Sequence, residues 1–344
     1  MTQSTSQKKD CIATINNQTV EINKLSILIP VYNSEKTIGR LVDTIVAQLQ
    51  TQFNALEIVL VNDGSIDNSH FCALQVVKRY PGMVKYIQLA RNFGEHNAVM
   101  GGLNYVTGDC VAIIDDDFQN PPLEILNLVE KLRKGYDVVY SYYEKKHHSW
   151  FRNLGSAFND WVATKLLAKP KGLYLSSFKV INAFLVRIVI QYNGPFPYID
   201  GIILRSTTNI GRQLCRHEDR EQGRSNYTLG KLIHLWSNMS TGYSITPLRI
   251  VSLIGLLISV LAIVLFIFFV TVRLSGSIFI QQDIPPGWAS TITLITFFSG
   301  LQISVLGVIG EYLGRLFLTI NRLPQFVVRD TYGLDEPKER NYEQ

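Results

Sequence analysis

A run of 23 residues without a charged side chain, residues 250–272, limits the folds open to this chain more than any other feature. A helix rises about 1.5 Å per residue, so this run can cross a hydrocarbon core of about 30 Å. Residues 288–309 form a second uncharged run, and Gly300, Gly307 and Gly310 in or beside it suit close packing against another helix. Two buried core helices are the alternative, but the lengths favour a transmembrane hairpin.

The charges around the two runs predict how the chain is oriented. The connection at 273–287 carries only Arg273 and Asp283. The basic residues beyond the other ends of the runs are Lys231, Arg249, Arg315, Arg322 and Arg329. Because Lys and Arg accumulate on the cytoplasmic side of membrane helices, we expect the large N-terminal domain and both termini in the cytoplasm. The polar start, MTQSTSQKKD, gives no indication of a signal peptide.

Composition excludes several other classes of protein. Hydrophobic residues make up 47% of the chain and charged residues 18%, which excludes a disordered chain. The net charge of +5 is too small to indicate a nucleic-acid partner. The four cysteines, at 11, 72, 110 and 215, lack metal-ligand spacing, so we expect no disulfide framework.

The N-terminal half alternates between short apolar runs and segments with helical periodicity. The runs predict strands at 25–30, 57–61, 84–89, 110–114 and 137–142. The periodic segments predict helices at 38–49, 68–79, 95–106 and 123–134. Strands separated by helices of this length predict an α/β fold with a mainly parallel sheet.

Polar clusters follow four of these strands, at 30–35, 62–65, 91–94 and 115–122. One such cluster could be only a helix cap, and Asp67 is a good candidate for that role. Four clusters at one edge are better explained by a ligand site, because ligands of parallel sheets bind beyond the carboxyl ends of the strands.

Three consecutive aspartates, Asp115, Asp116 and Asp117, form the strongest chemical signal. They repel one another unless a positive group lies nearby, and hard oxygen ligands suit Mg²⁺ or Mn²⁺. The alternative is a solvated turn in which Asp115 caps the loop.

The four polar blocks, PVYNSE, NDGSID, RNFG and DDDFQNPP, resemble those of family 2 glycosyltransferases in order and spacing. The resemblance implies a GT-A fold, which is Rossmann-like. With the C-terminal hairpin, the chain is similar to the polyprenyl-phosphate glycosyltransferases, which include dolichol-phosphate mannose synthase, bactoprenol glucosyltransferases and the undecaprenyl-phosphate aminoarabinose transferase. SWFR, RSNY, TPLR and GEYLGR stand where the last of these has similar segments.

The resemblance implies an inverting transfer of a sugar from a nucleotide-sugar, a UDP-sugar by likeness to bacterial relatives, to a polyprenyl phosphate. In a bacterium the acceptor would be undecaprenyl phosphate. The product would serve cell-envelope glycan synthesis or lipopolysaccharide modification. It also implies Mg²⁺ or Mn²⁺ as cofactor, a location in the inner membrane and a homo-oligomer.

The resemblance assigns roles to individual residues. Asp117 and Gln119 would hold the metal against the diphosphate. Arg152, Arg220 and Ser225 would bind the acceptor phosphate, and Asp117 and Arg220 would take part in catalysis. The residues expected to bind the nucleotide-sugar are Pro30, Tyr32, Asn33, Glu35, Asp63 and Asp115. Asp116 replaces a small residue of the family pattern and receives no role.

The chain departs from the family pattern at two positions. Leu173 stands nearest to an aspartate proposed as catalytic base in relatives, and Asn226 replaces a common lysine. A phosphate monoester with a second pKa near 6 is mostly a dianion at neutral pH. It can therefore attack directly and needs positioning more than a base. If a base is needed, Asp200 is the candidate, and its alternative role is to cap the helix that follows.

The region between the sheet and the first apolar run is basic, because residues 145–224 hold 13 Lys and Arg against 5 Asp and Glu. Such a surface suits a lipid phosphate as well as anionic lipid.

The domains expected are an extension at 1–24, a cytoplasmic domain at 25–228, an interfacial amphipathic helix at 229–247, spans at 248–273 and 288–312 joined by a loop at 274–287, and a juxtamembrane helix and tail at 313–344. Packing against the globular domain is the alternative for 229–247.

Two other functions remain open at this point. A processive polysaccharide synthase of the same superfamily would carry a Gln-x-x-Arg-Trp block and more spans, and the chain has neither. A non-catalytic membrane scaffold that kept the fold would fit the changes at Leu173 and Asn226. The presence of Asp115, Asp117, Gln119 and Arg220 favours the enzyme.

Overall fold

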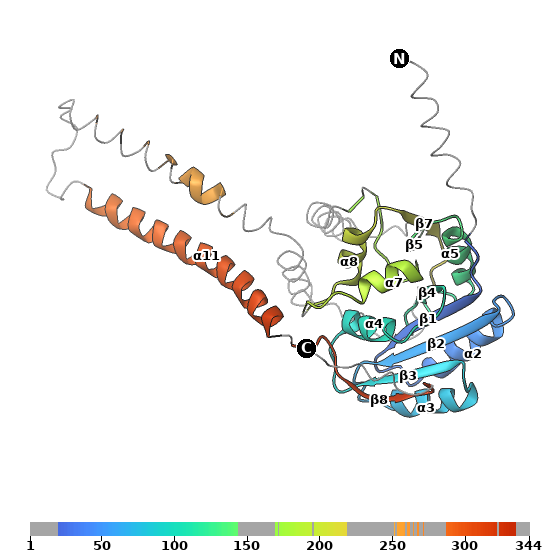
Figure 1. Ribbon diagram of the computed structural model, residues 1–344. Helices are drawn as coiled ribbons and strands as arrows, with labels where there is room; N and C mark the ends of the chain where they lie inside the picture. Colours follow the sequence, from blue (N-terminus) through green and yellow to red (C-terminus); the bar gives the residue numbers. More distant parts are fainter. Residues whose placement is uncertain are drawn as a thin grey trace, which may run out of the picture. The chain divides into compact units, whose positions relative to one another are not determined.

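The computed structural model divides the chain into two compact units, residues 1–227 with 322–344, and residues 228–321 (Figure 1). It describes residues 20–143, 169–170, 172–194, 196–218, 287–321 and 323–334, and separate positions between 251 and 271. The interfacial helix predicted at 229–247 lies outside the described residues.

An eight-stranded sheet forms the first unit, in the order β7-β5-β6-β4-β1-β2-β3-β8. The strands are β1 (Lys24–Val31), β2 (Ala55–Asn62), β3 (Val84–Leu89), β4 (Cys110–Ile113), β5 (Val138–Tyr142), β6 (Lys179–Asn182), β7 (Ile210–Leu214) and β8 (Val328–Tyr332). Four of the seven strand pairings are parallel: β1 with β2, β1 with β4, β2 with β3, and β5 with β7. The other three are antiparallel: β8 with β3, and β6 with both β4 and β5. The predicted α/β class with a mainly parallel sheet is confirmed.

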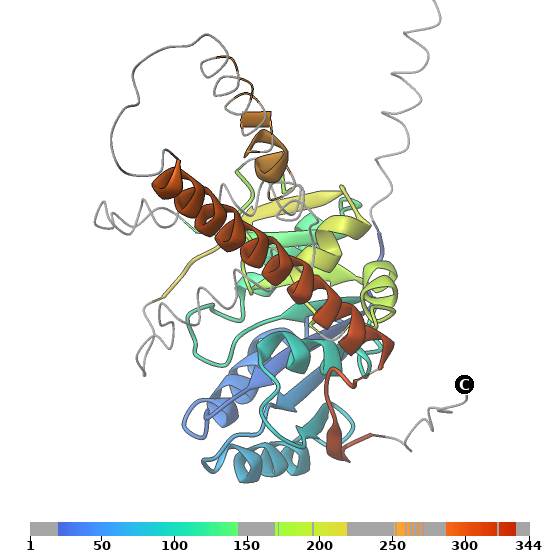
Figure 2. The ribbon, with the colours of Figure 1, turned by 90° about the vertical axis from the view of Figure 1, so that its left-hand side faces the viewer.

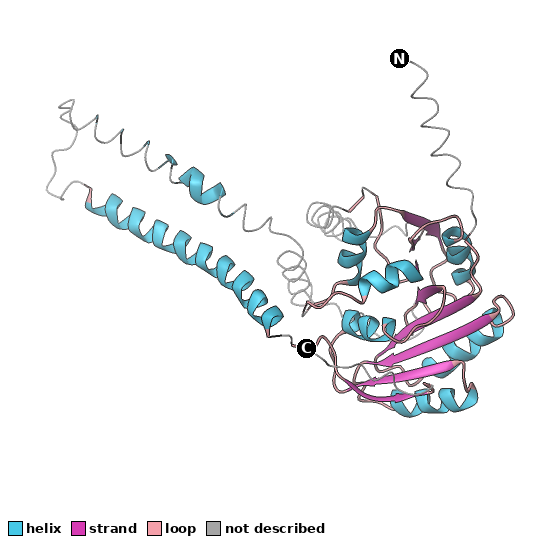
Figure 3. Ribbon diagram, viewed as in Figure 1, coloured by secondary structure: helices cyan, strands magenta, loops and turns pink. Residues whose placement is uncertain are grey.

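Helices cover both faces of this sheet (Figure 3). They are α2 (Ile38–Leu49), α3 (Ser69–Arg79), α4 (Glu95–Leu103), α5 (Glu124–Leu132), α7 (Ala183–Val189) and α8 (Ile199–Ser206). The apolar positions of α2, spaced as a helical face, are all buried. They share one core with α3, α5 and alternate residues of β1 such as Ile27 and Ile29. Leu28 points to the opposite face, where α4 approaches so closely that a Cβ on Gly102 would lie 2.2 Å from a Leu28 methyl group.

Among the described residues, β6, β7, β8 and α7 were not predicted, and α8 was considered only as a helix after Asp200. β6 is only four residues long, and Lys179 and Asn182 at its ends leave it without a recognisable apolar run. β8 lies within the segment expected to be a juxtamembrane helix and tail. It was missed because its sequence, VRDTY, has the polar pattern of an edge strand and no apolar run.

The second unit contains α11 (Trp288–Ile320), a single uninterrupted helix of 33 residues (Figures 1 and 2). Residues 297–320 of α11 are long and apolar enough to cross a membrane, with a mean hydropathy of 1.5. It is the one such helix among the described residues. The described positions between 251 and 271 are also helical.

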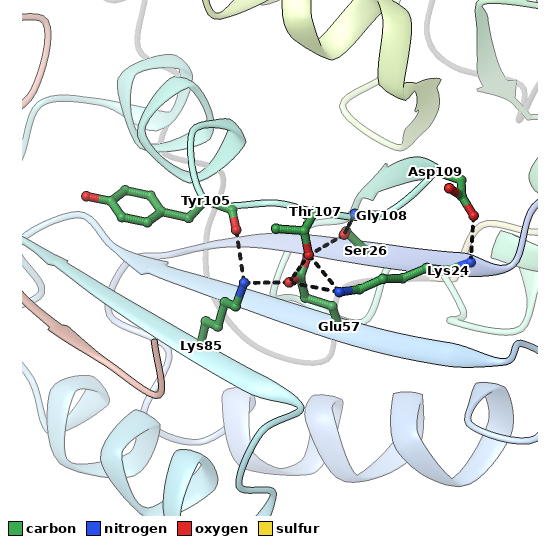
Figure 4. A network of polar contacts seen from close by, with 8 residues as sticks. All are labelled: Lys24, Ser26, Glu57, Lys85, Tyr105, Thr107, Gly108 and Asp109. Carbon is green, nitrogen blue, oxygen red and sulfur yellow. Dashed lines mark hydrogen bonds and ion pairs between the residues drawn. The ribbon is translucent and has the colours of Figure 1, made fainter. Parts of the chain in front are cut away.

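A buried ion-pair network ties the amino-terminal edge of the sheet together (Figure 4). Glu57 of β2, 3% exposed, accepts hydrogen bonds from Lys85 Nζ at 2.6 Å and from Ser26 Oγ at 2.5 Å. Thr107 donates to it from its backbone N–H and its hydroxyl, both at 2.8 Å. Burial raises the pKa of Glu57, but these hydrogen bonds outweigh burial and hold the pKa below its ordinary value of 4.5.

Replacing Glu57 should destabilise the first unit. Glu57→Gln leaves the Lys85 ammonium without a counter-charge, so we expect a loss of about 2–4 kcal/mol, measured as a lower Tm by differential scanning fluorimetry of the full chain in detergent. Because the folded-state pKa is lowered, the stabilisation is present above about pH 4.5 and is lost as the pH falls through that lower value. Glu130→Gln, which breaks the exposed pair with Arg133, is the control and should change the Tm little. Equal effects of the two variants would contradict this account.

Candidate active site

The acidic segment lies at the carboxyl end of β4, and hydrogen bonds hold each of its side chains. Asp115 Oδ2 accepts a hydrogen bond from Ser177 Oγ at 2.5 Å. Asp117 Oδ1 accepts one from the backbone N–H of Gln119 at 3.1 Å. Between them Phe118 has a φ of 60°, which is uncommon for a non-glycine residue and marks a tight turn.

Asp116, which received no role from the sequence, joins the acidic segment to the loop after β1. Its Oδ2 accepts a hydrogen bond from Ser34 Oγ and a longer one, at 3.3 Å, from the backbone N–H of Tyr32. Asp116 thus fixes part of the predicted nucleotide loop.

Desolvation, together with neighbouring carboxyl groups, disfavours the charged forms of Asp115 and Asp116. Desolvation, with the nearby charge of Glu95, raises the pKa of Asp115 to about 7, although the Ser177 hydrogen bond opposes it. Desolvation also raises the pKa of Asp116 to about 6, against the hydrogen bonds from Ser34 and Tyr32. The segment is therefore an acidic cluster in which a positive group would relieve repulsion.

The loops after β1 and β2 are joined by reciprocal hydrogen bonds. Asn33, at φ 56°, donates from its backbone to Ser65 Oγ and accepts at Oδ1 from the N–H of Ile66, both at 3.0 Å. Glu35 donates from its backbone to Asp67 Oδ2 at 3.1 Å. Asp67 Oδ1 also accepts from the N–H of Ser69 at 3.0 Å, which satisfies the start of α3. The N-cap of α3 is Asn68, so Asp67 is not the cap considered from the sequence but a contact between the loop after β1 and the first residue of α3.

Asp63, at the end of β2, is buried and holds the loop that follows β3. Its two oxygens accept hydrogen bonds from the backbone N–H groups of Phe93 and Gly94, at 2.7 and 2.9 Å. Burial raises its pKa, and these two hydrogen bonds oppose the rise. The adjacent Gly64 has a φ of 66°, and a Cβ there would lie 2.5 Å from the backbone nitrogen of Asn92. The fold therefore brings the polar blocks at 62–65 and 91–94 into direct contact.

Lys179 is a residue of this site that the sequence analysis missed. It pairs with Ile113 in the β4–β6 register and is 3% exposed. Its ammonium bonds to the carboxylate of Asp200, in the first turn of α8, and lies 5.1 Å from the centre of the Tyr140 ring. Tyr140 also donates to Asp200, at 2.8 Å. The only signal in the sequence is a lysine in an apolar stretch, FKVI.

A second group that the sequence analysis missed is a set of hydrogen-bonded side chains at the end of the acidic loop. Asn120 Oδ1 accepts a hydrogen bond from the Tyr143 hydroxyl at 2.7 Å. That hydroxyl lies 3.1 Å from Ser176 Oγ, and Ser141 Oγ donates to Ser176 at 2.8 Å. Residues from three distant segments therefore meet at this turn, which no spacing in the sequence could indicate.

The other predicted residues divide into those that are placed and those that are not. Pro30, Tyr32, Asn33, Glu35, Asp63, Asp115, Asp117, Gln119 and Asp200 are described and belong to the carboxyl edge of the sheet or to α8. Leu173, near the expected base position, is a buried core residue. Arg152, Arg220, Ser225 and Asn226 lie outside the described residues. Within the described ranges, no three His, Cys, Asp or Glu side chains are grouped so as to hold a metal ion by themselves.

The chain is similar to known glycosyltransferases. Residues 26–188 match the family model "Glycosyl transferase family 2". The undecaprenyl-phosphate 4-deoxy-4-formamido-L-arabinose transferase of Proteus mirabilis (strain HI4320) is 30% identical over 326 residues, which cover 94% of this chain and 98% of that protein. The protein of the same name from Yersinia pestis (strain Pestoides F) is 32% identical, over 92% of this chain and 95% of that one.

Among solved structures, glucosyl-3-phosphoglycerate synthase from Mycobacterium tuberculosis, in complex with Mn²⁺, UDP and glucosyl-3-phosphoglycerate, resembles this chain. The sequence identity is 18%, the match covers 67% of this chain and 81% of that chain, and the TM-score is 0.46.

The buried pair of Lys179 and Asp200 generates a prediction about stability. Lys179→Met leaves the Asp200 carboxylate buried without its partner, so we expect a loss of about 3–5 kcal/mol. Adding Asp200→Asn should recover part of that loss, because the uncompensated charge is removed. The measurement is the Tm of the single and double variants, with Arg133→Met as a control at a partly exposed ion pair. Strict additivity of the two substitutions would show that the pair does not couple.

Proposed function

The chain belongs to the family 2 glycosyltransferases, and we propose that it transfers a sugar, with inversion, from a nucleotide-sugar to a polyprenyl phosphate. The acceptor in a bacterium is undecaprenyl phosphate, and the product serves lipopolysaccharide or other cell-envelope modification. A UDP-sugar is the proposed donor. The observation that carries the proposal is the convergence of the loops after β1, β2 and β3 with the acidic segment after β4 at one edge of the sheet.

The donor nucleotide is proposed to bind on the loops after β1 and β2. Tyr32 is 44% exposed and can stack on a base, while Asn33 and Glu35 line the same loop. Asp63 uses both oxygens on the backbone of Phe93 and Gly94. Asp63 is therefore proposed to contribute to donor binding by fixing the loop at 91–94, as well as by contact with the nucleotide.

A divalent cation, Mg²⁺ or Mn²⁺, fits the acidic segment. Asp115 and Asp116 have raised pKa values because desolvation and neighbouring carboxylates disfavour their charge, and a cation would reverse that balance. Asp117 and Gln119 would hold it, and the donor diphosphate and water would complete its shell. When bound, the cation would supply charge neutralisation for the leaving nucleoside diphosphate.

The acceptor phosphate is proposed to be held by Arg152, Arg220 and Ser225, and its dianionic oxygen to attack the anomeric carbon directly. Arg220 would also neutralise the leaving group. Asp200 is the candidate if a base is needed. Its buried contacts with Lys179 and Tyr140 favour a structural role instead, and they replace the helix-cap role considered from the sequence.

We further propose that residues 248–273 and 288–312 form a transmembrane hairpin, with 274–287 outside and both termini in the cytoplasm. The length and hydropathy of α11 support the second span, and the helical positions between 251 and 271 support the first. The segment 229–247 would lie at the membrane interface. The proposed assembly in the inner membrane is a homo-oligomer.

Mass spectrometry of lipid products tests the proposed function. Full-length protein is incubated with undecaprenyl phosphate, Mg²⁺ or Mn²⁺ and a panel of nucleotide-sugars, and we expect an ion at the mass of the lipid phosphate plus one sugar residue. Asp117→Ala should reduce product about 10²-fold or more while the Tm is retained, because a group that positions charge at the diphosphate is lost. Asp43→Ala, which removes the exposed ion pair between α2 and Arg79, should be as active as wild type. Full activity of Asp117→Ala would favour a metal-independent reaction.

Asp200→Asn separates a base from a structural residue. If the acceptor dianion attacks without a base, we expect turnover of the folded variant within about fivefold of wild type, since removal of a general base costs about 10²–10⁴-fold. The measurement is kcat at saturating donor and acceptor. A fall of 10²-fold or more at an unchanged Tm would make Asp200 the base.

A further inference from the structure

The chain returns from the second unit to complete the catalytic sheet. β8 pairs antiparallel with β3, with Tyr332 opposite Tyr86 and Val328 opposite Leu89. Before the strand begins, the carbonyl of Val327 accepts a hydrogen bond from the N–H of Ala90 at 2.8 Å. The next residues after Ala90 are Arg91 to Gly94, the loop bound by Asp63. The segment 323–334 therefore anchors the base of a proposed donor loop.

The side chain of Tyr332 reaches a second donor loop through β3. Its ring stacks on that of Tyr86, with centroids 5.7 Å apart and an angle of 21° between the planes. The Tyr86 hydroxyl, fully buried, accepts a hydrogen bond from Asn62 Nδ2 at 2.9 Å. Asn62 Oδ1 in turn accepts one from the N–H of Ser65 at 3.0 Å, and Ser65 Oγ accepts one from the N–H of Asn33. An unbroken series of contacts thus connects Tyr332 to the loops after β1 and β2.

We propose that Tyr332 is a positioning residue for the donor nucleotide: its ring fixes Tyr86 and, through Asn62, the loop at 62–65. The proposal rests on the function proposed above, since it needs these loops to bind a nucleoside diphosphate. It adds a requirement that the sequence motifs do not contain. A chain segment that follows the membrane-spanning unit takes part in shaping the donor site.

Because of the position of β8 in the sheet, we expect a substitution at Tyr332 to affect only the binding of the donor. Four strands, β3, β2, β1 and β4, separate β8 from β6, which carries Lys179. The Tyr332 ring contacts those of Tyr86 and His70, with centroids 5.7 and 6.3 Å apart. A change at Tyr332 should therefore alter nucleotide affinity and leave the affinity for the polyprenyl phosphate unchanged.

The experiment compares Tyr332→Ala with Tyr332→Phe in the full-length protein in nanodiscs. Calorimetry with UDP, GDP and dTDP in the presence of Mg²⁺ first identifies the nucleotide that the wild type binds. Tyr332→Ala should raise the Kd for that nucleotide about fivefold, the factor expected from one aromatic pair. Tyr332→Phe keeps the ring and should stay within about twofold of wild type. Phe184→Ala, which removes a more exposed aromatic side chain (51%) from α7, is the control.

Two further readouts separate positioning from general destabilisation. Hydrogen exchange at the amides of Ser65, Phe93 and Gly94 should accelerate about tenfold in Tyr332→Ala, while the amides of β4 keep their protection. The KM for undecaprenyl phosphate should not change.

The inference would be overturned by an unchanged nucleotide Kd in a folded Tyr332→Ala protein, by a parallel rise in donor Kd and acceptor KM, or by an equal loss in Tyr332→Phe. A wild-type protein that bound none of the three nucleotides would instead refute the proposed function, and this inference with it.

Discussion

Desolvation and mutual repulsion of the adjacent carboxyl groups at the end of β4 form the constraint on which the rest of the site depends. Each carboxylate is held by a different part of the chain: Asp115 by Ser177, Asp116 by Ser34 and the backbone of Tyr32, and Asp117 by the backbone of Gln119. Hydrogen bonds to the charged form lower its free energy and so offset part of the cost of bringing these groups together. The same contacts fix the loops that surround the acidic segment. The hydrogen bonds that stabilise the carboxylates therefore also set the geometry of these loops.

The second unit is inserted into the chain of the first, between β7 and β8. Residues 228–321 form this unit, and the chain on both sides of it belongs to the catalytic unit. The sheet therefore has an edge strand, β8, that the chain reaches only after it has passed through α11. Gln325, just before that strand, donates to the carbonyls of Tyr192 and Gly194 at 2.6 and 2.8 Å. The segment that follows α11 is thus held to the first unit both by Gln325 and by the pairing of β8 with β3.

Local pattern was sufficient where one face of an element meets a continuous core. The predicted bounds of α2 and β3 agree with the structure, because α2 buries an unbroken apolar stripe and β3 is a short run with four of its six residues buried. It was insufficient for β6, whose polar residues are compensated by partners far away in the sequence, and for β8, which has the polar pattern of an edge strand. Lys179 is such a residue, since its buried charge is explained only by Asp200, 21 positions later.

The sequence by itself determined the α/β class, the polar blocks at the carboxyl edge of the sheet and the apolar length of α11. These follow from periodicity and composition, which depend on near neighbours in the chain. Only the tertiary structure decided that Asp63 holds the loop at 91–94, that Asp116 holds the loop after β1, and that Asp200 is paired with Lys179. Burial removes a charged group from water wherever the fold places it, and the partner that compensates for this can come from any part of the chain.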